Sequence, residues 1–254
     1  MTQECLFSVA SNNKEAAIFK IDLKKAYDCV DWGFLGILLA KIGLRSICIK
    51  WVMACVENVH YSVIINGILS SFFRAERGLR QRCPLSPLLF ILVMNTLTLQ
   101  INRAVADNLC RPVKICKDIF LSHNLFVDDI LIFAMICKQS WICINNILQK
   151  FQAASGILIN KDKSKLYHND TNDDLVLWIA NLLGIGLESI SCGIKYLGFN
   201  LKAKGYRNQD WSWLIDRFYS RISISCGYIH IGTGCAVPTG GLLGPYLSSA
   251  SFHL

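Results

Sequence analysis

Three aspartates lie within short apolar segments that have the composition of buried β-strands. Residues 16–23 read AAIFKIDL and include Asp22, and residues 119–135 read IFLSHNLFVDDILIFAM and include Asp128 and Asp129. Short runs rich in β-branched and aromatic residues predict strands rather than helices. A carboxylate at the end of a buried strand is costly to keep charged unless a cation or a hydrogen-bond donor lies near it. We therefore expect the folded protein to neutralise these three acids.

Two interpretations of the acids follow from the residues alone. In the first, Asp128 and Asp129 are turn residues and Asp22 is an exposed strand end. In the second, the acids form a divalent metal site of oxygen ligands, of the Mg²⁺ type, that holds a phosphate-bearing substrate. The pattern of residues leaves both interpretations open.

The remaining pattern predicts a mixture of helices and strands. Asp31 is a helix N-cap candidate, Asn66-Gly67 predicts a hairpin, Ser86-Pro87 predicts a helix start, and Gly156 a helix end. We expect helices over residues 32–42, 46–58, 86–102, 140–155, 174–183 and 211–224, and further strands over 157–159 and 195–201. The predicted class is α+β, with antiparallel strands and helices packed on one face.

Composition excludes several classes of protein. The chain is 53% hydrophobic with a mean hydropathy of +0.38, which argues against a disordered or collagen-like chain. The uncharged stretch 83–102 is continuously apolar only over 88–94, far short of the ~20 residues of a membrane-spanning helix. The N-terminal residues lack the pattern of a signal peptide. We expect an intracellular protein, nuclear or cytoplasmic, without a membrane partner.

The twelve cysteines are scattered through apolar runs and form no CxxC pair. This pattern favours small buried apolar residues over a metal site or a disulfide framework. The formal charge is +8, which is typical of proteins that meet a polyanion. The basic residues concentrate in residues 74–82 and 161–165.

Several segments resemble the reverse transcriptases of non-LTR, LINE-type retrotransposons, particularly the plant kind. In chain order they are FKIDLKKAYDCVDW, GLRQRCPLSPLLF, LFVDDILIF, SGILINKDKSKL and KYLGFNL. They match the family's catalytic motifs in the family's order, over about residues 16 to 225. The set is far more specific than the Asp-Asp pair alone.

The resemblance implies a palm domain whose antiparallel sheet carries the three aspartates. Asp22 and Asp128 would bind two Mg²⁺ ions, with Mn²⁺ as a possible substitute, and Asp129 would assist. The backbone carbonyl of Leu23 would add a ligand. Two such ions activate the attacking 3′-hydroxyl and stabilise the leaving pyrophosphate.

The resemblance also implies binding residues. Tyr27 matches the aromatic that excludes a ribose 2′-hydroxyl, although a core tyrosine is the alternative. The remaining positions are Gly78 and Gln81 beside the incoming nucleotide, Lys163 near the triphosphate, and Tyr196, Leu197 and Gly198 at the primer end. The alternatives are a solvated lysine at position 163 and a buried strand at the KYLGF segment.

The implied function is RNA-directed DNA polymerase, with an RNA template, a DNA primer and dNTPs as partners. We expect residues 1–15 to be a remnant of the fingers, 16–203 the palm, 204–225 the start of a thumb-like helix, and 226–254 an unassigned, disordered or out-of-frame tail. Arg82 stands where the family has glycine and favours the alternative, an inactive retroelement remnant or basic nucleic-acid-binding module. A membrane-associated basic protein is a third alternative, based on hydropathy.

Overall fold

The computed structural model describes residues 2–11, 15–169 and 173–230. The chain divides into a first unit, residues 1–205, and a second unit, residues 206–254. The helices of the first unit are α1 (Thr2–Ser11), α2 (Ala26–Cys29), α3 (Trp32–Lys41), α4 (Ser46–Glu57), α5 (Leu85–Ala106), α6 (Lys138–Ser155) and α7 (Asp174–Leu183). The second unit contains α8 (Ser212–His230).

The centre of the first unit is a five-stranded sheet with the order β13-β12-β1-β10-β9. Its strands are β1 (Ala16–Ile21), β9 (His123–Phe126), β10 (Asp129–Met135), β12 (Lys165–His168) and β13 (Gly186–Ser189). β1 pairs antiparallel with β10 on one side and with β12 on the other. The expectation of antiparallel strands holds except for β12 and β13, which are parallel. Sequence analysis missed these two strands, whose short polar sequences lack a clear alternation.

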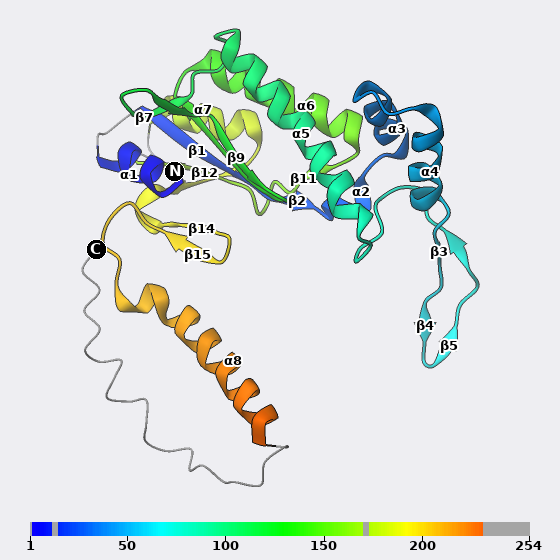
Figure 1. The fold of residues 1–254 in the computed structure, drawn as a ribbon. Helices are drawn as coiled ribbons and strands as arrows, with labels where there is room; N and C mark the ends of the chain where they lie inside the picture. The colour runs from blue at the N-terminus through cyan, green and yellow to red at the C-terminus, as the bar shows by residue number, and fades with distance from the viewer. Residues whose placement is uncertain (1, 12–14, 170–172, 231–254) are drawn as a thin grey trace. The chain divides into compact units, whose positions relative to one another are not determined.

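Both faces of this sheet are covered, as Figure 1 shows. Ala17, Phe19 and Ile21 of β1 belong to the larger core, which also contains the buried faces of α3, α5, α6 and α7. Ala16 and Ile18 belong to a second core, with α1 and with Tyr196. Burial on both faces explains why β1 is an almost continuous apolar run.

The expectation of helices on one face is therefore correct for the large helices and incomplete for α1. Cys5, Leu6 and Val9 of α1 are fully buried in the second core. The sequence predicts a fingers remnant over residues 1–15, and α1 within that range packs against the central sheet.

Two-stranded ribbons make up the remaining β-structure. They are β2 (Leu23–Lys24) with β11 (Leu158–Ile159), β3 (His60–Tyr61) with β6 (Phe73–Arg74), β4 (Ile64–Ile65) with β5 (Ile68–Leu69), β7 (Val113–Cys116) with β8 (Ile119–Leu121), and β14 (Ile194–Tyr196) with β15 (Phe199–Leu201). The Asn66-Gly67 hairpin is confirmed, with φ of 51° and 84° at its two turn residues. The single strand expected over residues 195–201 is instead the β14–β15 hairpin, because Leu197 and Gly198 both adopt positive φ and reverse the chain.

Local signals place most helix ends correctly. The Asp31 side chain accepts from the Phe34 N–H at 2.7 Å, and Gly156 ends α6 with φ of 75°. The predicted start of α5 was wrong, because the helix begins at Leu85 after Pro84 and uses no side-chain cap. It also continues beyond residue 102, since Ile101 and Ala104 extend its buried face.

Among the described residues, α5 is the one helix long and apolar enough to span a membrane by length and composition. One face of α5 is buried in the larger core. The structure thus accounts for the apolarity of this helix through packing within the first unit.

In the second unit, α8 extends to His230. The segment 226–254, expected to be an unassigned, disordered or out-of-frame tail, therefore begins as helix. Residues 231–254 lie outside the described residues.

Candidate functional site

The register of β1 and β10 brings the three aspartates to one edge of the sheet. Ile21, the last residue of β1, pairs with Ile130 of β10. The next position along each strand places Asp22 opposite Asp129. Because Asp129 also pairs with Phe126 of β9, the turn between β9 and β10 consists of Val127 and Asp128. Asp22, Asp128 and Asp129 therefore share this edge, which we call the carboxylate edge.

The tip of the β9–β10 hairpin is conformationally strained. Val127 has φ of 57°, a left-handed value that is rare for a β-branched residue. Asp128, the second turn residue, is exposed, whereas Asp129 begins β10 and is half-buried. The turn interpretation is thus correct for Asp128 and wrong for Asp129, whose backbone pairs within the sheet.

The carboxylates at this edge influence one another. Burial raises the pKa of Asp129, and the negative charges of Asp128 and Asp22 raise it further, while the charge of Lys20 lowers it. The edge therefore concentrates negative charge in a partly buried place, which favours a bound cation.

The donor set matches a hard divalent cation, because such ions prefer carboxylate and carbonyl oxygens. The Asn160 N–H donates to the Asp22 carbonyl at 2.8 Å, so the Leu23–Ile159 pair is the non-hydrogen-bonded pair of the β2–β11 ribbon. The Leu23 carbonyl is thus left unused by β11. In the described residues, however, no three acidic, thiol or imidazole side chains converge as a ready metal cluster. The backbone register thus brings the oxygen ligands to the same edge of the sheet, but their side chains do not converge on a single metal position.

A cavity of about 450 Å³ adjoins Asp128 and contains several predicted site residues. It is lined by Leu23, Lys25, Ala26, Tyr27, Gln81, Arg82, Ser86, Pro87 and Asp128. The Tyr27 ring stacks on Phe90 of α5 with centroids 4.3 Å apart. Burial raises the pKa of Tyr27, and the charge of Asp128 raises it further. Packing therefore holds a rigid aromatic wall beside the carboxylate edge.

Gln81 and Gly78 have different structural roles. The Gln81 side chain donates to an Asp28 carboxylate oxygen at 3.0 Å, and Gln81 also lines a second cavity of about 540 Å³ with Arg77 and Arg80. Gly78 is buried with φ of 91°, and a Cβ there would lie 2.6 Å from the Asp28 carbonyl oxygen. Gly78 thus permits close approach of two backbones, and Gln81 faces the cavities.

The other predicted residues are not among those that line the cavity beside Asp128. Lys163 is exposed in the turn between β11 and β12. Tyr196 is buried in the second core, with 6% of its surface exposed. Leu197 and Gly198 form the tip of the β14–β15 hairpin. The nucleotide and primer roles of these residues stay predictions.

The backbone at Arg82 adopts a left-handed conformation, with φ of 62°. Glycine adopts this conformation without steric cost, whereas a residue with a side chain is strained by about 1–2 kcal/mol. Arg82 is also exposed and lines the cavity beside Asp128. The position therefore has the geometry that suits glycine and instead carries a long cation.

A family model of reverse transcriptase (RNA-dependent DNA polymerase) matches residues 2–201, which is more than half of the chain. The chain belongs to the reverse transcriptase family. It is 24% identical over 115 residues to the retrovirus-related Pol polyprotein from type-1 retrotransposable element R2 of Popillia japonica. That match spans 45% of this chain and 18% of the polyprotein. The resemblance to non-LTR reverse transcriptases is confirmed, and the plant kind stays a prediction.

Solved structures support the fold of this reverse transcriptase chain. Telomerase from Candida tropicalis in complex with a fragment of telomeric RNA aligns with a TM-score of 0.54 and 12% identity, over 80% of this chain and 31% of that one. Apo telomerase from Candida tropicalis gives 0.53 and 14%, over 82% and 35%. Telomerase from Candida albicans gives 0.50 and 18%, over 67% and 30%. These likenesses confirm the palm-type α+β fold.

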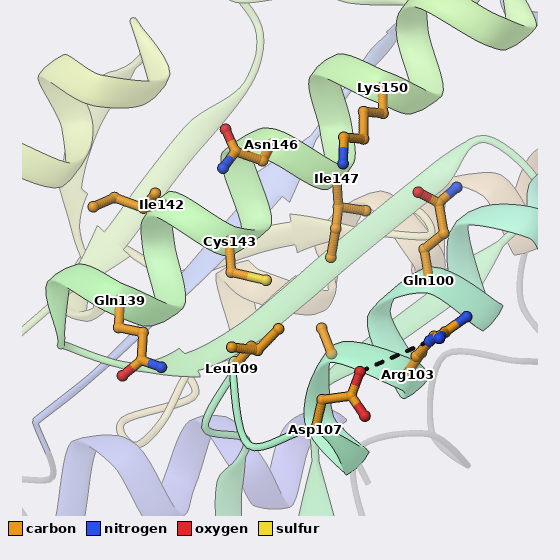
Figure 2. Close-up of a pocket in the computed structure, with 11 residues that line it drawn as sticks. Gln100, Arg103, Asp107, Leu109, Gln139, Ile142, Cys143, Asn146, Ile147 and Lys150 are labelled. Atoms are coloured by element: carbon orange, nitrogen blue, oxygen red, sulfur yellow. Dashed lines mark ion pairs between the residues drawn. The ribbon is translucent and has the colours of Figure 1, made fainter.

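A groove of about 770 Å³ in this reverse transcriptase chain lies between α5 and α6 (Figure 2). Leu109, Cys143 and Ile147 are among its apolar lining residues, and Arg103 pairs with Asp107 at 3.7 Å. None of the predicted site residues line it. The groove is therefore distinct from the cavity beside Asp128.

Sequence analysis missed residues that hold Asp22 in place. The Asp22 N–H donates to the hydroxyl of Ser164 at 3.0 Å, and Ser164 is fully buried. Together with the Asn160 contact, this anchors the Asp22 backbone to the segment 160–164. In the sequence, Ser164 lies next to Lys163 in the fourth motif, SGILINKDKSKL.

Replacing Gly78 with alanine should destabilise the protein by about 2–4 kcal/mol, because strain at positive φ adds to a backbone clash. Gly36→Ala is the matched control, since a Cβ at this position of α3 meets nothing within 4 Å. That control should gain about 0.5–1 kcal/mol from helix propensity. Urea unfolding measures both variants, and equal effects would contradict the proposed close approach at Gly78.

Replacing Arg82 with glycine should stabilise the protein by up to about 1 kcal/mol, because relief of left-handed strain exceeds the added entropy of the unfolded chain. Arg80→Gly is the control, because Arg80 is exposed in the same segment and has no positive φ. Thermal unfolding should separate the two variants. If both lose stability equally, the backbone at position 82 is not strained.

Proposed function

We propose that this chain is the palm region of an RNA-directed DNA polymerase that adds deoxynucleotides to a primer 3′-hydroxyl. The observation that carries the proposal is the position of the carboxylate edge beside the cavity lined by Tyr27 and Gln81. A volume of about 450 Å³ is in the range of small-ligand sites. Family membership supports the same reaction.

In this proposal Asp22, Asp128 and the Leu23 carbonyl hold two Mg²⁺ ions, with Mn²⁺ as a substitute, and Asp129 assists. Divalent ions in such a pair supply charge neutralisation at the attacking and leaving oxygens. Tyr27 restricts the space beside the sugar, and Gln81, which lines the same cavity, contacts the nucleotide. Lys163 serves the triphosphate, and the β14–β15 hairpin holds the primer end.

The proposed partners are an RNA template, a DNA primer and dNTPs. Arg77 and Arg80 line the second cavity and Lys25 lines the first, so both cavities present cations to a polyanion. The similar R2 polyprotein is named for a retrotransposable element, which fits a role in copying such an element. We propose an intracellular site of action, nuclear or cytoplasmic.

The second candidate function is nucleic-acid binding without catalysis, as expected of a retroelement remnant. Arg82 favours it, because its strained backbone and long side chain lie at the cavity beside Asp128. All three aspartates are present at the carboxylate edge, so in this alternative the defect would lie where the nucleotide binds rather than at the aspartates.

Primer extension distinguishes these functions. On poly(rA)/oligo(dT) with dTTP, the chain should extend the primer in Mg²⁺, and Asp128→Asn should abolish extension because it removes an anionic ligand. Asp107→Asn, an exposed carboxylate at the end of α5, should leave the rate unchanged.

Extension no greater than that of the Asp128 variant would contradict the polymerase proposal for the natural chain. Arg82→Gly then locates the defect. Recovered extension would identify Arg82 as the lesion, and persistent inactivity with retained binding of template–primer would leave the binding function.

A further inference from the structure

Lys20 is the one charged residue of β1, the central strand of the sheet. The five other residues of this strand are buried, and Lys20 is half-buried. A lysine at such a position is costly unless its ammonium group finds partners. Its partners therefore indicate why the strand tolerates it.

The ammonium group of Lys20 donates a hydrogen bond of 2.5 Å to the backbone carbonyl of Lys195 in β14. This contact joins residues 175 positions apart in the chain. It links the strand that leads to Asp22 directly to the β14–β15 hairpin. Hydrogen bonds from charged donors are stronger than neutral ones, so the link restrains the hairpin.

Lys20 also lies near Asp129. Lys20 pairs with Leu131 in the β1–β10 register, and Asp129 is two residues from Leu131 on the same face. Such diagonal neighbours are within reach of long side chains. Consistent with this placement, the charge of Lys20 lowers the pKa of Asp129.

The cross-strand neighbour on the other side is Lys165 of β12, which would repel Lys20 if it were unpaired. Lys165 forms an ion pair with Glu188 of β13 at 3.6 Å. The Lys165 ammonium group is thus directed away from Lys20 and toward Glu188. The Lys20 ammonium group can then interact with the hairpin and with Asp129.

The β14–β15 hairpin also contains a tyrosine whose hydroxyl is buried. Tyr196, next to Lys195, has a buried hydroxyl without a hydrogen-bond partner in the described residues. Burial raises the pKa of Tyr196, and the charge of Asp129 raises it further. The charge of Asp129 therefore acts on the buried side of the hairpin as well as on Lys20.

We propose that Lys20 is a positioning residue that sets the distance between the β14–β15 hairpin and the carboxylate edge. It acts through the Lys195 carbonyl and Asp129, without contacting nucleotide. The consequence for primer placement rests on the proposed function, whereas the restraint on the hairpin does not.

The test compares Lys20→Met, which removes the donor and the charge at similar length, with Lys20→Arg, which keeps both. Lys150→Met is the control, because Lys150 is an exposed lysine on α6 at the groove of Figure 2. Hydrogen exchange of the β14 and β15 amides, measured without substrate, should be about 10-fold faster in Lys20→Met. It should be unchanged in Lys20→Arg and in Lys150→Met.

In primer extension, Lys20→Met should raise the KM for template–primer about 10-fold while the KM for dTTP stays within about 2-fold. Unchanged hairpin exchange in Lys20→Met would overturn the proposal, even if the chain is an active polymerase. Equal changes in both KM values would also overturn it. If the natural chain is inactive, the exchange result alone decides the restraint. Lys20→Leu, which also removes the donor and the charge, replaces the Met variant if circular dichroism shows that the latter is unfolded, with the same expected exchange.

Discussion

The antiparallel register of β1 and β10 is the constraint on which the candidate site depends. Both strands bury both faces, and a slip of one residue would turn every side chain of the shifted strand to the opposite face of the sheet. The register is therefore strongly specified by apolar side chains such as Phe19 and Phe133, which belong to different cores. Because the strands end where the apolar run ends, this packing also determines where Asp22, Asp128 and Asp129 meet. The polar edge is a consequence of the apolar core.

Backbone strain collects around this edge. Lys25, Arg82 and Val127 are non-glycine residues at positive φ, and they belong to three different motifs of the chain. Lys25 and Arg82 line the cavity that Asp128 adjoins, and Val127 immediately precedes Asp128. Conformations of this kind persist only where the surrounding structure determines them. In the neighbouring structure, the Tyr27 ring stacks on Phe90 and the Gly78 N–H donates to the Val30 carbonyl.

Much of the fold was predictable from the sequence, and the reasons are local. Asp31, Asn66-Gly67 and Gly156 act through nearby backbone, so their effects on helix ends and turns were readable without tertiary information. The aspartates were recognisable because they interrupt apolar runs.

By contrast, β12 and β13 form a short parallel pair whose strands are specified by neighbours in the sheet. The roles of Lys20 and Ser164 depend on contacts with residues more than 100 positions away, so no local pattern reveals them. Gly78 was attributed to nucleotide approach, whereas its contact with the Asp28 backbone appears only in three dimensions.

The most direct test of the account is to locate a bound metal within the folded chain. Fe²⁺ substituted for Mg²⁺, with ascorbate and hydrogen peroxide, cleaves the backbone next to the ion, and mass spectrometry identifies the fragments. The account predicts cleavage in two segments, around Asp22 and around Asp128, with both suppressed by excess Mg²⁺ and by Asp22→Asn. Cleavage confined to other segments, or cleavage insensitive to Asp22→Asn, would contradict a metal site at the carboxylate edge.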